Sequence, residues 1–224
     1  EAASRYLSVN VDVKEYSGDS VSLTVSENES VSGIYLIKGE SYDPKSPDGI
    51  WLSDKYAAAN GINVGDSLTL VYKNIEIDGI VKGMIKSGEY TICVRDESQL
   101  MPDYNTYGFA YISPYMYEKN VGFDFYPQIN VLSNMPEHDF HEAVDLQLEN
   151  TVLILTKDET ISYTGAYSEV QEGQTMGLIL PVLFLLISVL TMVTTMHRLV
   201  VKEKTQIGTL KALGFKDRRI LRHY

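Results

Sequence analysis

The sequence predicts an α+β fold, with a mixed-sheet domain that has a β-rich insert and is followed by a long stalk and transmembrane helix. Two observations predict it. Short segments with strand-like alternation, separated by turns rich in Gly, Pro and Asp, fill most of the chain before Ser162. An uncharged apolar stretch, residues 173–196, then follows and can cross a hydrocarbon layer of roughly 30 Å. We therefore expect three parts: residues 1–172, the span 173–196 and residues 197–224.

The strands are predicted from alternation and from the turns between them. Residues 6–12 and 21–25 alternate on either side of a Ser-Gly-Asp turn, which indicates a hairpin. A short apolar segment at 33–37 then opens the β-rich insert, which we place at about residues 34–122. Further strands are expected at 50–52, 67–72, 75–84, 90–94, 109–112, 127–132 and 152–155. Gly79 interrupts the alternation of its strand, which favours a β-bulge there.

The helices are predicted from capping residues and apolar spacing. Ser53 can cap a short helix at 54–60, and Gly61 is suited to end it. One helical turn is expected at 114–120 and a longer helix at 137–149. From about Ser162 onward we expect one helix that runs without a break into the membrane. Pro181 lies in the span, as a harmless irregularity or as a hinge.

Charge is divided unevenly about the apolar stretch. Residues 1–172 hold 11 Lys and Arg against 28 Asp and Glu, whereas residues 197–224 hold eight against two. Because short flanks rich in Lys and Arg stay in the cytoplasm, residues 197–224 are expected to be cytoplasmic and residues 1–172 extracellular, in the cell membrane. The acidic outer part argues against a nucleic-acid partner.

The outer part must be stabilised by its own packing. Cys93 is the single cysteine, so an intrachain disulfide is excluded, and burial of this residue is expected. Trp51, before an apolar helix, is expected in the core. The chain starts at Glu1 without a signal-like segment, so an upstream span or signal is expected to export the outer part. We accordingly expect a piece of a longer, multi-pass protein.

Beyond the membrane, residues 205–213 are amphipathic. Ile207, Leu210 and Leu213 share one helical face, Gly214 is a natural stop, and Phe215 follows it. A solvated helix does not need these apolar side chains together. They are expected to pack on further membrane spans or to dock on a cytoplasmic partner.

Two stretches resemble a known family. PVLFLLISVLTMVTTMHRLVVKEKTQIGTLKALGF, residues 181–215, resembles the second membrane span and following cytoplasmic segment of the FtsX-like, MacB-like ABC transporter permeases. IWLSDKYAAANGINVGDSLTL, residues 50–70, resembles the extracytoplasmic MacB-like core domain of the same permeases. The resemblance covers nearly the whole chain and is specific in these two blocks.

The resemblance implies a permease subunit that works with a separate cytoplasmic ABC ATPase. The outer domain would lie between the first two spans, and the segment after the second span would form the coupling helix on the ATPase. The implied coupling residues are Gln206, Ile207, Gly208, Leu210, Lys211, Ala212, Leu213, Gly214 and Phe215. The family often has Glu where this chain has Gln206, which puts a charged contact there in doubt.

The chain itself is not expected to be an enzyme. It has no P-loop and no hydrolase motif, so ATP hydrolysis is assigned to the partner chain, and no cofactor is expected. Membrane lipid and a second permease copy or subunit are further expected partners. The outside partner would be a peptide, a lipid or a protein. Two alternatives stay open: a signal relay that activates an extracellular partner such as a cell-wall hydrolase, and a membrane-anchored sensor.

Two groups of side chains outside the membrane are candidate sites. Five tyrosines cluster in sequence and can present a partner or substrate surface, or can lie half-buried on strands and loops. They are Tyr104, Tyr107, Tyr111, Tyr115 and Tyr117. His138 and His141 have a spacing that can hold a metal, but a solvated helix face is the commoner use of such a pair, and no metal is expected.

Overall fold

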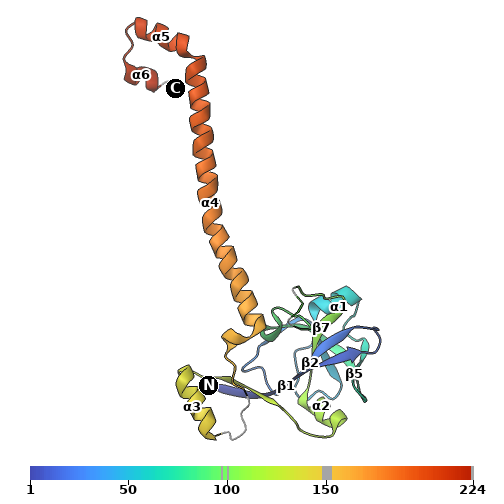
Figure 1. Ribbon diagram of the computed structural model, residues 1–224. Coiled ribbons are helices and arrows are strands. Elements are labelled where there is room, and N and C mark those ends of the chain that lie inside the picture. Colours follow the sequence, from blue (N-terminus) through green and yellow to red (C-terminus); the bar gives the residue numbers. More distant parts are fainter. Residues whose placement is uncertain (97, 100, 148–152, 223–224) are drawn as a thin grey trace. The chain divides into compact units, whose positions relative to one another are not determined.

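The computed structural model describes residues 1–96, 98–99, 101–147 and 153–222. The chain divides into two compact units, Glu1–Tyr167 and Ser168–Tyr224. The first unit holds an eight-stranded mixed sheet with short helices, and the second is helical (Figure 1). The predicted class, a mixed sheet followed by a long apolar helix, is confirmed.

The elements follow the predicted order closely. The strands are β1 (Ala2–Val13), β2 (Ser20–Ser26), β3 (Ile34–Gly39), β4 (Gly49–Ser53), β5 (Ser67–Tyr72), β6 (Ile75–Ser87), β7 (Tyr107–Ile112) and β8 (Gln128–Leu132). The helices are α1 (Asp54–Asn60), α2 (Pro114–Val121), α3 (Glu137–Gln147), α4 (Ile161–Lys202), α5 (Lys204–Ala212) and α6 (Asp217–Leu221), with 3₁₀ turns η1 (Gly88–Tyr90) and η2 (Lys157–Glu159). The hairpin is confirmed, because β1 and β2 pair antiparallel with Val9 opposite Leu23.

The sheet closes on itself. Strand β1 pairs with β2 and β5, and the circuit is completed by pairings of β2 with β7, β7 with β4, β4 with β6 and β6 with β5. The β2–β7 and β4–β6 pairs are parallel, and the others in the circuit are antiparallel. Strand β3 attaches to β6, and β8 attaches to the first residues of β1. Closure removes the free edges of the six strands in the ring.

The first unit has two buried clusters, one of them aliphatic and the other aromatic. Val21, Leu23 and Val25 of β2 belong to an aliphatic cluster that also contains buried side chains of β4, β5, β6, β7 and both short helices. The second cluster comprises Tyr42, Trp51, Ile85, Cys93, Tyr107, Phe109 and Tyr111. The intervening residues of β2, Ser22 and Thr24, are buried as well. Both faces of β2 are therefore covered, and Trp51, which is fully buried, is a core residue as predicted.

Gly79 does not form a bulge. The β5–β6 register runs through it without a shift, whereas the pairings of β6 with β4 and with β3 shift between Ile50 and Trp51 and between Leu36 and Lys38. A Cβ on Gly79 would lie 2.7 Å from Ile50 Cγ1 and 2.8 Å from Met116 Cε. Its role is to let the core and α2 approach the strand closely.

Three other local predictions need correction. The strand expected at 90–94 is wrong, because residues 88–90 form the turn η1 and irregular chain follows. Ser53 precedes α1 but makes no capping bond, and its Oγ instead accepts a hydrogen bond from Phe109 N at 3.4 Å. The strand expected at 152–155 is wrong for residues 153–155, which are irregular. Residue 152 of that strand lies outside the described residues, as do residues 148 and 149 of the helix expected at 137–149.

Candidate functional site

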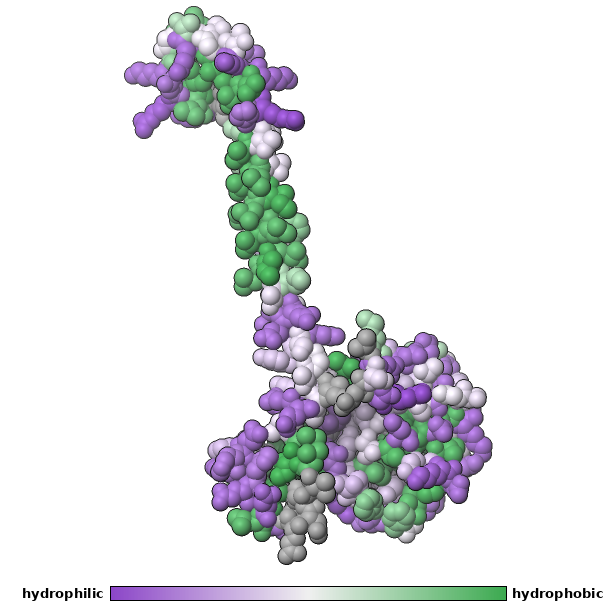
Figure 2. All heavy atoms as spheres, in the orientation of Figure 1, coloured by the Kyte–Doolittle hydropathy of each residue, from purple (hydrophilic) through white to green (hydrophobic). Residues whose placement is uncertain are grey.

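Helix α4 is the element to which the candidate site belongs. It runs for 42 residues, from Ile161 to Lys202, and passes Pro181 without a break. Within the described ranges it is the one helix that is long and apolar enough to cross a membrane, with a window of mean hydropathy 2.6 that the chain leaves uncovered. Figure 2 shows this window as a hydrophobic band with hydrophilic side chains beyond both of its ends. The predicted continuous helix is confirmed as far as Lys202.

Three threonine hydroxyls within the apolar stretch have hydrogen-bond partners inside the helix. Thr191, Thr194 and Thr195 each donate a hydroxyl hydrogen bond of 2.8 Å to the carbonyl oxygen four residues earlier. Such bonds let threonine enter a hydrocarbon layer without an unpaired hydroxyl. The stretch is therefore suited to lipid in its polar atoms as well as in its hydropathy.

The first turns of α4 belong to the sheet unit and rest on one loop segment. Ser162 Oγ donates a hydrogen bond of 3.1 Å to the carbonyl oxygen of Ile92. Gly165 faces the same residue, and a Cβ there would collide with Ile92 Cδ1. Since Ile92 follows η1 closely, a displacement of the start of α4 acts first on the segment after this turn.

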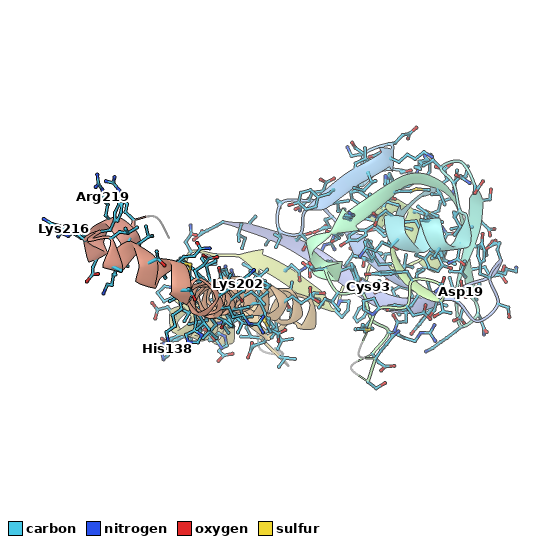
Figure 3. All side chains as sticks on the ribbon, turned by 90° about the horizontal axis from the view of Figure 1, so that it is seen from above. Asp19, Cys93, His138, Lys202, Lys216 and Arg219 are labelled. Carbon is cyan, nitrogen blue, oxygen red and sulfur yellow. The ribbon has the colours of Figure 1, made fainter. Side chains whose placement is uncertain are left out.

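The segment from Tyr90 to Cys93 covers the aromatic cluster. The Tyr90 ring stacks on Phe109 at 4.5 Å, and its hydroxyl oxygen lies 2.6 Å from Thr24 Oγ1 and 2.8 Å from Ser22 Oγ. Cys93, labelled in Figure 3, is buried as expected. Burial raises the pKa of the Cys93 thiol to about 12, so it stays protonated and is not a nucleophile at neutral pH.

The five tyrosines do not form a shared surface. Tyr107, Tyr111 and Tyr117 are buried, Tyr104 is half-buried, and Tyr115 is exposed. The prediction of an exposed tyrosine surface is therefore wrong for three of the five. Burial is possible because each of these three hydroxyls has a partner within the unit: Asn10 Oδ1 at 2.6 Å from Tyr107, Ser87 Oγ at 2.9 Å from Tyr111, and the carbonyl oxygen of Phe125 at 3.1 Å from Tyr117.

The predicted coupling helix corresponds to α5 and its C-terminal cap. The Phe215 N–H donates to the Leu210 carbonyl at 3.1 Å, and the Gly214 N–H donates to the Lys211 carbonyl at 3.0 Å. With Gly214 at φ 86°, this is a Schellman cap, and the predicted stop at Gly214 is confirmed. Lys211 Nζ then lies 3.0 Å from Asp217 Oδ1, which joins α5 to the start of α6.

The apolar residues of this segment are divided by burial. Ile207 and Leu210 are half-buried, and Ile220 of α6, the helix that contacts α5, is buried. Leu213 and Phe215 remain 70% and 43% exposed. The other predicted coupling residues, which are Gln206, Gly208, Lys211, Ala212 and Gly214, are exposed as well. The expected common face is thus partly used inside the unit, and its C-terminal end is open to a partner.

A basic cluster next to this segment was not predicted as a site. Lys216, Arg218, Arg219 and Arg222 line an open concavity together with Leu213 and Phe215. Lys216 and Arg219 lie near each other at the α6 end of the ribbon in Figure 3. The sequence signal for this cluster is the excess of eight basic over two acidic residues in 197–224, which also predicts the membrane orientation.

The histidine pair does not gather further ligands. The His138 side chain is 88% exposed and lies 3.6 Å from the Asp139 carboxylate, measured from Nδ1 to Oδ1. Within the part of the chain that the structure describes, no three His, Cys, Asp or Glu side chains are grouped as a metal would require.

Comparison with known proteins finds a family match within the second unit. Residues 178–224 match the family model of the FtsX-like permease C-terminal segment. No curated protein matches the sequence. One similar solved structure is a domain of a protein from Porphyromonas gingivalis whose name describes it as a permease. It is 12% identical, with a TM-score of 0.40, over 72% of this chain and 73% of that one. A likeness at this TM-score does not establish a common fold.

The family match covers the larger part of the apolar stretch of α4 and continues through the described part of α5 and α6. The sequence resemblance and the family match therefore agree on the same segment. FtsX-like permeases are membrane components of ABC-type systems, so the match suggests a permease component that does not itself catalyse a reaction. Residues 178–224 are therefore similar to the C-terminal segment of FtsX-like permeases.

Proposed function

We propose that this chain is the part of an ABC-type permease that couples a separate cytoplasmic ATPase to events outside the membrane. Residues 1–172 are extracellular, residues 173–196 cross the membrane, and residues 197–224 carry the ATPase contact. The observation that carries the proposal is the continuity of α4 over 42 residues, from the sheet unit to the residue before the α5 N-cap. A continuous helix transmits displacement, whereas a loop at the membrane surface would absorb it.

The outer end of the proposed pathway is the contact of α4 with Ile92. Movement of Ser162 and Gly165 pushes or releases the segment that carries Tyr90 and Cys93 over the aromatic cluster. A closely packed cluster responds to such a push by a discrete repacking rather than by gradual deformation. The outer unit can thus change its contact with a peptide, lipid or protein partner when the helix moves.

The inner end is the exposed part of the coupling segment. Leu213 and Phe215 offer apolar surface beside the capped end of α5, and the Lys211–Asp217 ion pair helps to hold the turn between α5 and α6. An apolar anchor on a turn of defined geometry is typical of a contact that fills a pocket on a partner. Gln206 is exposed and supplies a neutral hydrogen-bonding group, so no ion pair at that position is required.

The test is co-purification of the ATPase with a variant permease. We expect Leu213→Asp to abolish association, because truncating or charging a buried interface anchor costs about 2 kcal/mol or more. Leu213 is a sharper choice than Leu210, whose half-burial means that its substitution can disturb the α5–α6 pair itself.

Leu146→Asp is the matched control, since Leu146 is 80% exposed on α3 in the other unit. This variant should retain the ATPase at wild-type yield. Wild-type recovery of the ATPase with Leu213→Asp would overturn the proposed contact.

A further inference from the structure

We propose that the α6 end of the second unit is an anionic-lipid contact, in which Lys216, Arg218, Arg219 and Arg222 bind phospholipid headgroups at the membrane surface. The proposal rests on the crossing of the membrane by α4. It does not rest on the ATPase contact at Leu213.

The first observation is an uncompensated positive charge. The segment after the span holds two acids, Glu203 and Asp217, and Asp217 is engaged with Lys211 at 3.0 Å. Among the residues that the structure describes, none of the four cations has a carboxylate within ion-pair distance. Their charge is therefore available to an outside anion.

The second observation is the mixture of charge with exposed apolar surface. Leu221, which is 76% exposed, lies between Arg219 and Arg222. In Figure 2 the hydrophilic side chains of this end surround hydrophobic ones. Arginines beside exposed apolar side chains suit the boundary between headgroups and acyl chains, where both kinds of side chain are satisfied.

The third observation is position along the chain. Lys202 ends the helix that contains the span, and the four cations follow it within the next 20 residues. Basic clusters immediately beside a membrane span meet the negative surface potential of anionic lipid, which strengthens association by about fivefold for each Lys or Arg. The headgroup layer at the end of the span can therefore supply a complementary charge to this cluster.

The experiment measures amide hydrogen exchange of residues 216–222 in the full chain, reconstituted in nanodiscs of phosphatidylcholine alone or with phosphatidylglycerol added. We expect exchange in this segment to be about tenfold slower in the anionic discs, and the difference to shrink in high salt. The variant R218Q/R219Q/R222Q should lose the difference. Exchange of α1, in the sheet unit, reports that each variant is folded.

The matched control removes the same charge elsewhere. Lys38, Lys45 and Lys119 are exposed in the sheet unit, and K38Q/K45Q/K119Q should keep the lipid-dependent slowing. Equal exchange in the two kinds of disc, or slowing that persists in R218Q/R219Q/R222Q, would overturn the proposal. Slowing that requires added ATPase in neutral discs would also overturn it, because the cations would then belong to the protein contact.

Discussion

The two units of this chain differ in whether their apolar side chains are buried. In the sheet unit, large side chains such as Trp51, Leu52 and Tyr111 are buried by the chain itself. In the helical unit the apolar window of α4 is uncovered, and Ile220 is the one buried apolar residue within the described part. The first unit therefore buries its own apolar core, while the described part of the second unit leaves most of its apolar surface exposed.

The comparison predicts that one substitution has different effects in the two units. Leu52→Ala should destabilise the sheet unit by about 2–5 kcal/mol, because a fully buried side chain leaves a cavity. Leu185→Ala, at a residue 63% exposed in α4, should leave the unfolding of the sheet unit unchanged. Denaturant unfolding followed by fluorescence of Trp51, the single tryptophan, measures both. Equal losses in the two variants would contradict the division into units.

A charge placed in the span should separate the units further. Leu185→Arg lies near the middle of the apolar stretch and should disfavour membrane insertion by about 2.5–3.5 kcal/mol. Leu146→Arg, on the exposed face of α3, should not affect insertion. The inserted fraction can be measured by protease protection in membrane vesicles. Unchanged insertion of Leu185→Arg would show that α4 does not cross the hydrocarbon layer.

The reactivity of Cys93 reports on the cover of the aromatic cluster. Its pKa of about 12 lowers the thiolate fraction at pH 8 strongly, so modification by a disulfide reagent should be at least about 100-fold slower in the native chain than in denaturant. Ile92→Gly, which removes the side chain that faces Gly165, should speed the native reaction. A native rate close to the denatured rate would mean that the segment after η1 does not cover the cluster.

The smallest effect is expected from the ion pair of Arg5 with Glu27. The Arg5 guanidinium, 2.7 Å from Glu27 Oε1, lowers the pKa of that carboxyl through its hydrogen bonds. A lowered folded pKa means that the stabilisation is present above the unfolded pKa, about 4.3, and is lost as the pH falls through the folded value.

Because both side chains are partly exposed and solvent screens the pair, its contribution to the free energy of unfolding should be small. Glu27→Gln should therefore flatten the loss of stability between about pH 5 and pH 3 slightly, whereas Lys45→Gln should leave it unchanged. Thermal unfolding across that pH range makes the measurement. An unaltered pH profile in Glu27→Gln would show that this ion pair does not contribute to the pH dependence of stability.

The sequence predicted the local elements better than it predicted the closed ring of strands. Alternation located the β1–β2 hairpin, and α1 begins and ends where its flanking residues indicated. The ring was missed because it depends on parallel pairs such as Val21 with Gly108, whose partners are far apart in sequence. Periodicity reports which way a residue faces and does not report its distant neighbour.

The errors at the site have a related cause. Ser22 and Thr24 alternate with the apolar residues of β2, as residues on a solvated face would. They are nevertheless buried, and the Tyr90 hydroxyl lies within hydrogen-bond distance of both. In residues 90–94, Tyr90 and Cys93 pack on the aromatic cluster while Ile92 faces Gly165, so the apolar pattern there reflects burial on two sides of a loop and not a strand. The burial of the predicted coupling segment could not be read from sequence, because it depends on the contact of α6, which holds the buried Ile220, with α5.

The most direct test follows the segment at Ile92 while nucleotide binds to the ATPase. In the chain assembled with its ATPase in nanodiscs, we predict that ATP binding changes amide exchange of residues 88–94. We predict that Glu169→Pro removes this change while the ATPase stays bound, because it deletes a backbone hydrogen bond at an exposed turn of α4 between the sheet unit and the apolar stretch and kinks the helix there. Pro181 lies within the apolar stretch, where such a loss is better tolerated. A response that is absent in the wild type, or that is undiminished in Glu169→Pro, would contradict transmission through α4.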